Sequence, residues 1–195
     1  MNEPNTGCPG SGKGTLCKML SQNHGYHHIS VGDLLRDMTQ TLQSERDYII
    51  AGFVRDGNLL PTEIVLDILK DACGAAFEEH SIVVVDGFPR RFDQAVAADK
   101  GVRNDCCSIF SFVFLLTEPK YRAPDLVLFF GCGKEESKRR YLTRKRGQDD
   151  EAMFEKRFEE FASQNEAILD HYRKQDKLIT VSIPAYSIHP LEDAD

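Results

Sequence analysis

Residues 7–15 read Gly-Cys-Pro-Gly-Ser-Gly-Lys-Gly-Thr, and no other stretch constrains the fold of this chain as strongly. The spacing is that of a phosphate-binding loop, G-x-x-x-x-G-K, whose glycines let several backbone N–H groups converge on one anion. Lys13 adds a mobile cation. A helix that starts at such a loop points the positive end of its dipole at the phosphates. The stretch therefore predicts a binding site for a nucleoside triphosphate.

Composition sets the broad class of protein. A chain of 195 residues with 41% hydrophobic and 28% charged residues is expected to form one soluble α/β domain. The formal net charge of -7 argues against a general nucleic-acid binder, because binding to the phosphate backbone needs a basic surface. We also expect no membrane partner.

The cysteines and histidines suggest no metal site. The six cysteines form no C-x-x-C motif and no Cys/His spacing typical of zinc, so we expect reduced thiols in a cytoplasmic protein without a signal peptide. His24, His27 and His28 cluster, but their spacing fits no metal template. A solvated surface cluster is the simpler interpretation.

The second informative stretch is residues 81–90, Ser-Ile-Val-Val-Val-Asp-Gly-Phe-Pro-Arg. Its apolar run is β-branched and predicts a strand that is buried on both faces of a parallel sheet. The carboxylate of Asp86 then emerges at the carboxyl end of the strand, where α/β folds bind their ligands. Magnesium prefers such hard oxygen ligands and keeps several waters, so Asp86 is a candidate magnesium residue.

Two motifs together carry a family resemblance. The loop has the variant G-x-P-G-x-G-K-G-T, with Gly14 between the lysine and the hydroxyl of Thr15, and residues 86–90 read Asp-Gly-Phe-Pro-Arg. Both resemble the adenylate kinase family, which includes the UMP/CMP kinase branch, and the chain resembles its short-lid members. The resemblance implies a single three-layer α/β/α P-loop domain over residues 1–195 with a parallel sheet. It also implies a monophosphate-binding region at residues 30–60, a short lid at residues 140–150, and magnesium bound with ATP.

The start of the chain departs from that pattern. Residues 1–6 are polar and contain Pro4, so they cannot form the buried strand that normally precedes a phosphate loop. We therefore expect the first strand to be missing or degenerate, either because the chain is truncated relative to its relatives or because another segment fills the slot. Residues 100–122 are an unusual insertion with an apolar run at 108–116, which we expect to be a strand on or in the sheet. A surface insertion or an error in the definition of the chain are the alternatives.

Apolar spacing predicts the other elements. Strands are expected at 26–30, 123–130 and 177–183; helices are expected after the loop, over 37–56, from 61 onwards, around the basic run at 138–146, and across 154–172.

The resemblance assigns roles to individual residues. The residues expected at ATP are Gly10, Ser11, Gly12, Lys13, Gly14, Thr15, Arg140 and Arg144. Those expected at the monophosphate are Ser30, Val31, Arg36, Asn58, Leu59, Leu60, Gly87, Phe88, Pro89, Arg90, Gln94, Arg146 and Arg157. The catalytic residues are expected to be Lys13, Arg90, Arg140, Arg144, Arg146 and Arg157; magnesium is expected at Asp86, through water, and at Thr15. Asp149 and Asp150 are expected to anchor arginines when the lid closes.

The implied reaction is reversible phosphoryl transfer from ATP to a nucleoside monophosphate, by a monomer. Gln94 favours AMP, because adenylate kinases carry Gln at this position and UMP/CMP kinases tend to carry Asn. Val31 points the other way, since it replaces the threonine typical of adenylate kinases and the pyrimidine branch also lacks a hydroxyl there. A UMP/CMP kinase is therefore the alternative. A nucleotide-binding protein impaired in turnover is the rival from another class, and a P-loop kinase of small metabolites is a weaker third.

Overall fold

The structure is a computed structural model that describes residues 8–80, 82–101, 113–115, 124, 126–144 and 149–182; for residues 100, 101 and 113–115 it describes the backbone alone. Segment 1–6, most of the insertion at 100–122 and Arg146 lie outside these residues. The predictions about a missing first strand and about Arg146 therefore stay predictions.

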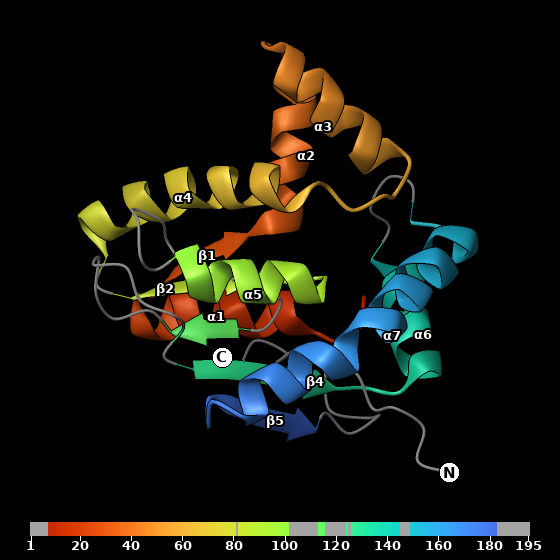
Figure 1. Cartoon of the computed structure of the whole chain (residues 1–195). Helices are drawn as coiled ribbons and strands as arrows, with labels where there is room; N and C mark the ends of the chain where they lie inside the picture. Colours follow the sequence, from red (N-terminus) through yellow and green to blue (C-terminus); the bar gives the residue numbers. More distant parts are fainter. Residues whose placement is uncertain are drawn as a thin grey trace, which may run out of the picture.

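The strands form two parallel pairs with a short strand between them (Figure 1). In the first pair, β1 (His27–Ser30) runs parallel to β2 (Val83–Asp86); in the second, β4 (Leu126–Gly131) runs parallel to β5 (Leu178–Ser182). The short strand β3 (Val113–Leu115) pairs with β4 and contacts β2 on its other side. The described part of the apolar run at 108–116 is thus a strand within the sheet layer.

The prediction of a parallel sheet is wrong for β3, which runs antiparallel to β4. Residues 116–125 alone separate these two strands. Neighbouring parallel strands need a crossover of a dozen or more residues, usually with a helix, whereas antiparallel strands accept a shorter connection. The length of the connection therefore fits the observed direction.

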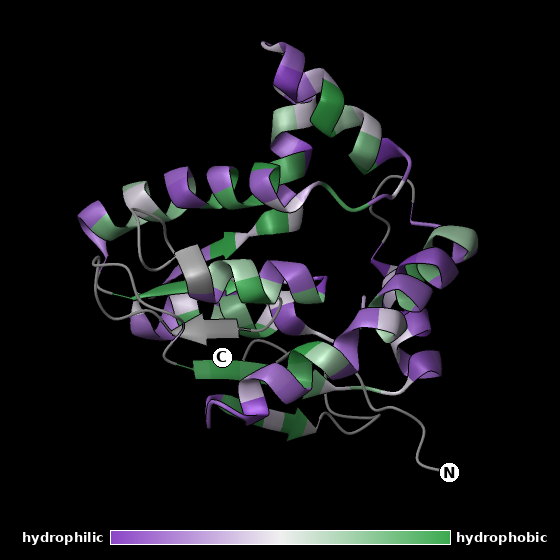
Figure 2. Cartoon of the chain, in the orientation of Figure 1, coloured by the Kyte–Doolittle hydropathy of each residue, from purple (hydrophilic) through white to green (hydrophobic). Residues whose placement is uncertain are grey.

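Helices cover both faces of the strands and make three layers. Val83 and Val85 belong to a core beneath α4 (Thr62–Glu79), α5 (Phe92–Gly101) and α7 (Glu151–Arg173). Val84 belongs to a smaller core with Cys17 of α1 (Lys13–His24) on the opposite face. This alternation follows from the two-residue period of a strand and accounts for the continuous apolar run of β2. Figure 2 shows β2 and β4 as apolar strands, while the helices alternate polar and apolar faces.

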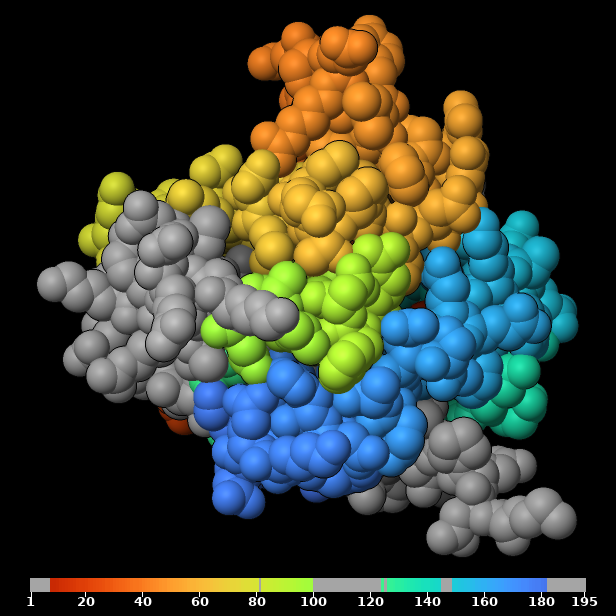
Figure 3. All heavy atoms as spheres, in the orientation of Figure 1, coloured from red at the N-terminus to blue at the C-terminus, as the bar shows by residue number. Residues whose placement is uncertain are grey.

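Two helices stand apart from these layers as a lobe, shown in orange in Figure 3. They are α2 (Val31–Thr41) and α3 (Glu45–Arg55). The prediction of one helix over 37–56 is wrong, because Leu42 ends α2 in a left-handed conformation (φ 38) and Ser44 starts α3 with a capping box to Asp47. The remaining helix, α6, spans Lys134–Thr143. Among the helices the structure describes, none has the length and apolarity needed to cross a membrane.

Candidate functional site

The phosphate loop rests on helix α6. Gly10 and Gly12 adopt φ +91 and +93, which a side chain rarely permits. A Cβ at Gly10 would lie 2.2 Å from the carbonyl oxygen of Ser137, so only glycine allows this close approach. The Cys8 thiol lies 2.7 Å from the Ser137 hydroxyl, which ties the loop to the same turn of α6.

Lys13 begins helix α1, directly after Gly12, and lies in the concave side of the loop. Its Nζ donates to the carbonyl of Cys8 at 3.1 Å and to the hydroxyl of Ser11 at 2.9 Å. Burial lowers the pKa of Lys13, and the carboxylate of Asp86 opposes that effect. The ammonium group is therefore held at the place where phosphates would lie.

Asp86 ends β2 beside the loop, at the carboxyl edge of the parallel pair. Burial alone would raise its pKa, but His28, Lys13 and Arg90 together hold the pKa of this carboxyl below its usual value. A Cβ at Gly14 would contact the Asp86 carboxylate at 3.6 Å, so α1 passes close to it. An ionised, partly buried carboxylate next to a phosphate loop is a hard oxygen donor of the kind that suits magnesium.

One cavity of about 780 Å³ joins the loop, Asp86 and a set of arginines. The predicted site residues that line it are Gly10, Ser11, Gly12, Lys13, Gly14, Thr15, Ser30, Arg36, Asn58, Leu59, Asp86, Gly87, Arg90, Arg140, Arg144 and Arg157. Five other predicted residues are buried and do not line it: Val31, Leu60, Phe88, Pro89 and Gln94. The cavity brings together segments that lie far apart in the sequence.

The side of the cavity below the α2–α3 lobe carries two arginines. Arg36 pairs with Asp33 one turn earlier in α2, and Arg90 donates from Nε to the carbonyl of Gly87 at 3.0 Å. Gln94 accepts a hydrogen bond from the backbone N–H of Arg90 at 2.8 Å, so its carbonyl oxygen braces the loop that carries Arg90. Asn58 accepts from Lys156 of α7 at 2.7 Å, which joins the two sides of the cavity.

The opposite side is formed by α6 and the start of α7. Arg140 donates from Nε to Glu136 at 2.5 Å, while its buried Nη1 has no hydrogen-bond partner among the described residues. A buried, unsatisfied guanidinium nitrogen is costly, and a phosphate oxygen in the cavity would satisfy it. This observation fits a nucleotide with its phosphates at the loop.

Asp149 gathers the other two arginines of this side. Its carboxylate accepts from Arg144 at 2.6 Å and from Arg157 at 3.3 Å. Burial alone would raise its pKa, but these arginines and Tyr141 hold the pKa of Asp149 below its usual value. Asp150, which was expected to share this role when the lid closes, caps α7 in this structure by accepting from the N–H of Met153 at 2.7 Å.

Tyr141 is a member of this cluster that sequence reasoning missed. It is fully buried, its ring lies 4.1 Å from the Arg144 guanidinium, and its hydroxyl accepts from Arg157 at 2.8 Å. Burial, together with Asp149, raises the pKa of Tyr141 to about 12. Tyr141 and Arg144 are three residues apart, and side chains at this spacing are neighbours on a helix, so the sequence could have indicated their contact. Other missed cavity residues include Glu136, Arg139, Glu160 and Phe161.

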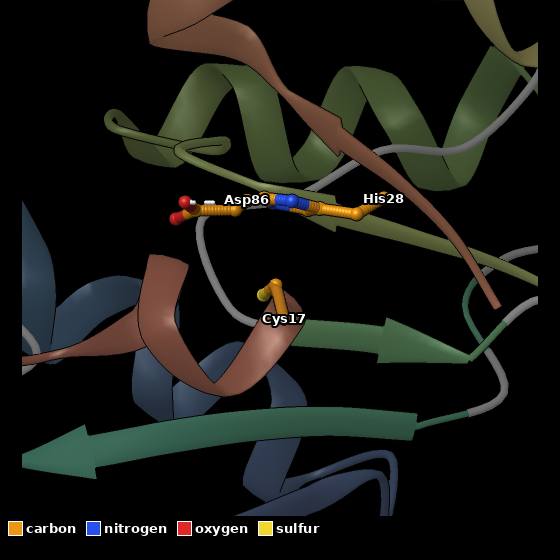
Figure 4. Close-up of side chains that lie close together, drawn as sticks. All are labelled: Cys17, His28 and Asp86. Atoms are coloured by element: carbon orange, nitrogen blue, oxygen red, sulfur yellow. Dashed lines mark ion pairs between the residues drawn. The ribbon is translucent and has the colours of Figure 1, made fainter. Parts of the chain in front are cut away.

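His28 also lies in the cavity wall, contrary to the expectation of a solvated surface cluster. Its side chain is 13% exposed, and its Nε2 lies 3.8 Å from the Asp86 carboxylate (Figure 4). The buried thiol of Cys17 lies next to both. These three residues are too widely spaced in the sequence to form a recognisable motif.

Comparison with known proteins gives consistent matches. The sequence model of the family described as "Adenylate kinase" matches residues 6–177. The chain is 31% identical over 178 residues to "Probable UMP-CMP kinase 2" of Arabidopsis thaliana, across 90% of this chain and 61% of the relative. It is 32% identical over 179 residues to "Adenylate kinase 1" of Schistosoma mansoni, across 90% of this chain and 81% of the relative. It is 32% identical over 175 residues to "Adenylate kinase isoenzyme 1" of Rattus norvegicus, across 87% of this chain and 79% of the relative. The chain thus spans about three fifths of the Arabidopsis relative and about four fifths of the other two.

Proposed function

We propose that this chain, which belongs to the adenylate kinase family, is a nucleoside monophosphate kinase that moves a phosphoryl group reversibly from ATP to AMP. One observation carries the proposal: a single cavity joins a phosphate loop, a carboxylate at a strand end and six arginines from four separate regions. A cavity with this many arginines can hold the anionic phosphates of two nucleotides at once. A site for a single nucleotide would not need arginines on both sides.

The two sides of the cavity suggest where each nucleotide binds. The loop and Lys13 lie beside Arg140 and Arg144, so we assign this side to the triphosphate of ATP. Arg36 and Arg90 line the part of the cavity toward the α2–α3 lobe, where we place the phosphate of the acceptor. Arg157 reaches the cavity from α7 and lies near Arg90, between the two sides.

This inventory suits phosphoryl transfer, which needs positioning and charge stabilisation more than covalent chemistry. Arginine forks bind phosphate oxygens bidentately and stay charged at any working pH. Closure of α6 and the start of α7 over the cavity would exclude water, which otherwise competes as acceptor. Asp86, through water, and Thr15 would hold magnesium, which neutralises charge on the phosphates when bound.

The choice of AMP rests on the family resemblance at Gln94, whose buried amide would have to turn from the Arg90 backbone into the cavity to reach the base. An amide can donate to and accept from adenine together, which is worth roughly 1 to 3 kcal/mol against the wrong base. Val31 and the relatives named as UMP-CMP kinases favour the alternative, a UMP/CMP kinase. Relatives of both names match at 30–32% identity, so identity does not separate the two.

The first experiment is a coupled assay with ATP and magnesium against AMP, UMP and CMP in parallel. Lys13→Ala and Arg90→Ala should abolish transfer and leave the fold intact, whereas Arg55→Ala, at an exposed position, should not change it. If the chain prefers UMP or CMP, that nucleotide replaces AMP as the proposed acceptor. Binding of ATP without turnover would instead identify an impaired nucleotide-binding protein. Near-normal turnover of either alanine variant would refute the assigned site.

A further inference from the structure

Two side chains of the cavity wall and a buried thiol behind them form a set of nitrogen, oxygen and sulfur donors. Cys17 comes from α1, His28 from β1 and Asp86 from β2 (Figure 4). One donor atom of each lies within 4.8 Å of the donor atoms of the other two. β1 and β2 are in parallel register with Ser30 opposite Asp86, so His28 lies diagonally across from Asp86 on the face that α1 covers.

His28 gives an independent sign that a partner is missing from this set. Its Nε2 is buried, makes no hydrogen bond within the described chain, and lies 3.8 Å from the Asp86 carboxylate, which is too far for one. A buried polar atom without a partner costs free energy comparable to a lost hydrogen bond. A cation bound between the two side chains would give Nε2 of His28 a partner.

We propose that Cys17, His28 and Asp86 form a binding site for one borderline-soft divalent transition ion, such as Zn²⁺, which shares Asp86 with the magnesium that accompanies ATP but takes nitrogen and sulfur ligands besides. Thiolate and imidazole ligands favour zinc and its neighbours over magnesium, which prefers oxygen. Two anionic ligands and a neutral imidazole also balance the charge of a divalent ion.

The geometry is close to what a tetrahedral ion needs. Zinc–ligand distances of about 2.0 to 2.3 Å place neighbouring ligand atoms about 3.5 Å apart. The pair of His28 and Asp86 is already at 3.8 Å, and the sulfur needs to approach by about 1.3 Å at most. His28 and Asp86 line the cavity, which gives the ion an entry path and a fourth position for water or a phosphate oxygen.

Binding has a chemical cost and a functional consequence. The Cys17 thiol is buried, and burial raises its pKa, so the metal must displace its proton to solvent. Asp86 would then be a ligand of this ion and no longer available to the waters of magnesium. The bound ion therefore inhibits phosphoryl transfer, a consequence that rests on the proposed function.

The test is a titration of the whole apo chain with Co²⁺, which substitutes for zinc and gives a thiolate-to-metal absorption band in the near ultraviolet. We expect one equivalent to bind with this band. Cys17→Ser should remove the band, and His28→Gln should weaken cobalt binding by about tenfold or more. Cys73→Ser is the matched control, since Cys73 is equally buried but belongs to α4 and the other core. Thermal melting of each apo variant checks that it folds.

The metal site and the kinase function can fail independently. A band that Cys17→Ser retains, or the absence of a band in the unaltered chain, overturns the proposed site. In a second arm, equimolar Zn²⁺ should inhibit transfer in excess magnesium, and Cys17→Ser should resist it. An inactive chain would count against the kinase function, while the cobalt titration would still decide the metal site.

Discussion

Replacing Tyr141 with Phe should slow phosphoryl transfer while leaving the fold intact. The hydroxyl of Tyr141 accepts a hydrogen bond from Arg157 at 2.8 Å, and its ring lies 4.1 Å from the Arg144 guanidinium and 5.3 Å from the Phe154 ring. Tyr141→Phe removes the hydroxyl and keeps both ring contacts. The variant therefore removes the contacts of the hydroxyl with Arg157 and Asp149, which orient Arg157 toward the cavity, and leaves the ring packing in place.

The size of the effect follows from the contacts of Arg157. A hydrogen bond from a charged donor contributes about 1.5 to 3 kcal/mol. Arg157 keeps Asp149 as a second acceptor at 3.3 Å, so we take the lower end of that range. If Arg157 must be oriented in the transition state, about 1.5 kcal/mol corresponds to an approximately tenfold fall in kcat. Tyr141→Leu should cost a further several-fold, because it also removes the cation–π contact with Arg144.

The assay is steady-state transfer from ATP to AMP, with thermal unfolding measured on the same preparations. Tyr48→Phe is the control, because Tyr48 is 62% exposed on α3. We expect the melting temperature to stay near that of the unaltered chain and the KM for ATP to change little. A kcat within twofold of the unaltered chain, in a folded Tyr141→Phe variant, would refute the orienting role of this hydroxyl.

Two further predictions concern the loop and helix α6. Gly10→Ala should abolish ATP binding in titration calorimetry, because the new Cβ would meet the Ser137 carbonyl at 2.2 Å; Gly25→Ala, also at positive φ but with no atom within 4 Å, should bind ATP normally. Hydrogen bonds from Arg139 and Arg140 lower the pKa of Glu136 to about 2, below the value of about 4.3 in an unfolded chain. The contribution of Glu136 to stability is therefore present above about pH 4.3 and is lost as the pH falls toward 2, so Glu136→Gln should be less stable at pH 6 and equally stable near pH 2 in urea unfolding. A stability difference that is constant over this pH range would contradict the pairing.

The sequence predicted the elements whose signals are local. The apolar run around Val84 indicated β2, because a strand that is buried on both faces consists of apolar residues. Gly25 indicated the end of α1, because the left-handed conformation at a helix end favours glycine. The break between α2 and α3 was missed although Ser44 and Asp47 carry a capping-box signal, because apolar spacing was read across it. The direction of β3 was not predictable from composition, since it depends on the connection to β4.

The candidate site was predicted best where a motif defines it and least where the fold brings distant residues together. Lys13, Asp86 and Arg90, which the motifs single out, line one cavity, and their roles at the phosphates and magnesium stay predictions. Gln94 is buried beneath Arg90, because its spacing of four along the chain allows the amide to return to the backbone of that residue. The approach of Cys17 to His28 depends on how α1 crosses β1, which no local pattern records.

Helix α6 connects two parts of the candidate site. Ser137 contacts the loop through both its carbonyl, against Gly10, and its hydroxyl, against Cys8. Arg140 lies less than one turn further along the same helix, and Arg144 follows at its end. A rigid helix transmits displacement along its length, so the position of the loop and that of the arginines are set together. In the described chain, the phosphate loop is thus supported by the helix that carries the arginines, and a change at Ser137 should disturb ATP binding and transfer together.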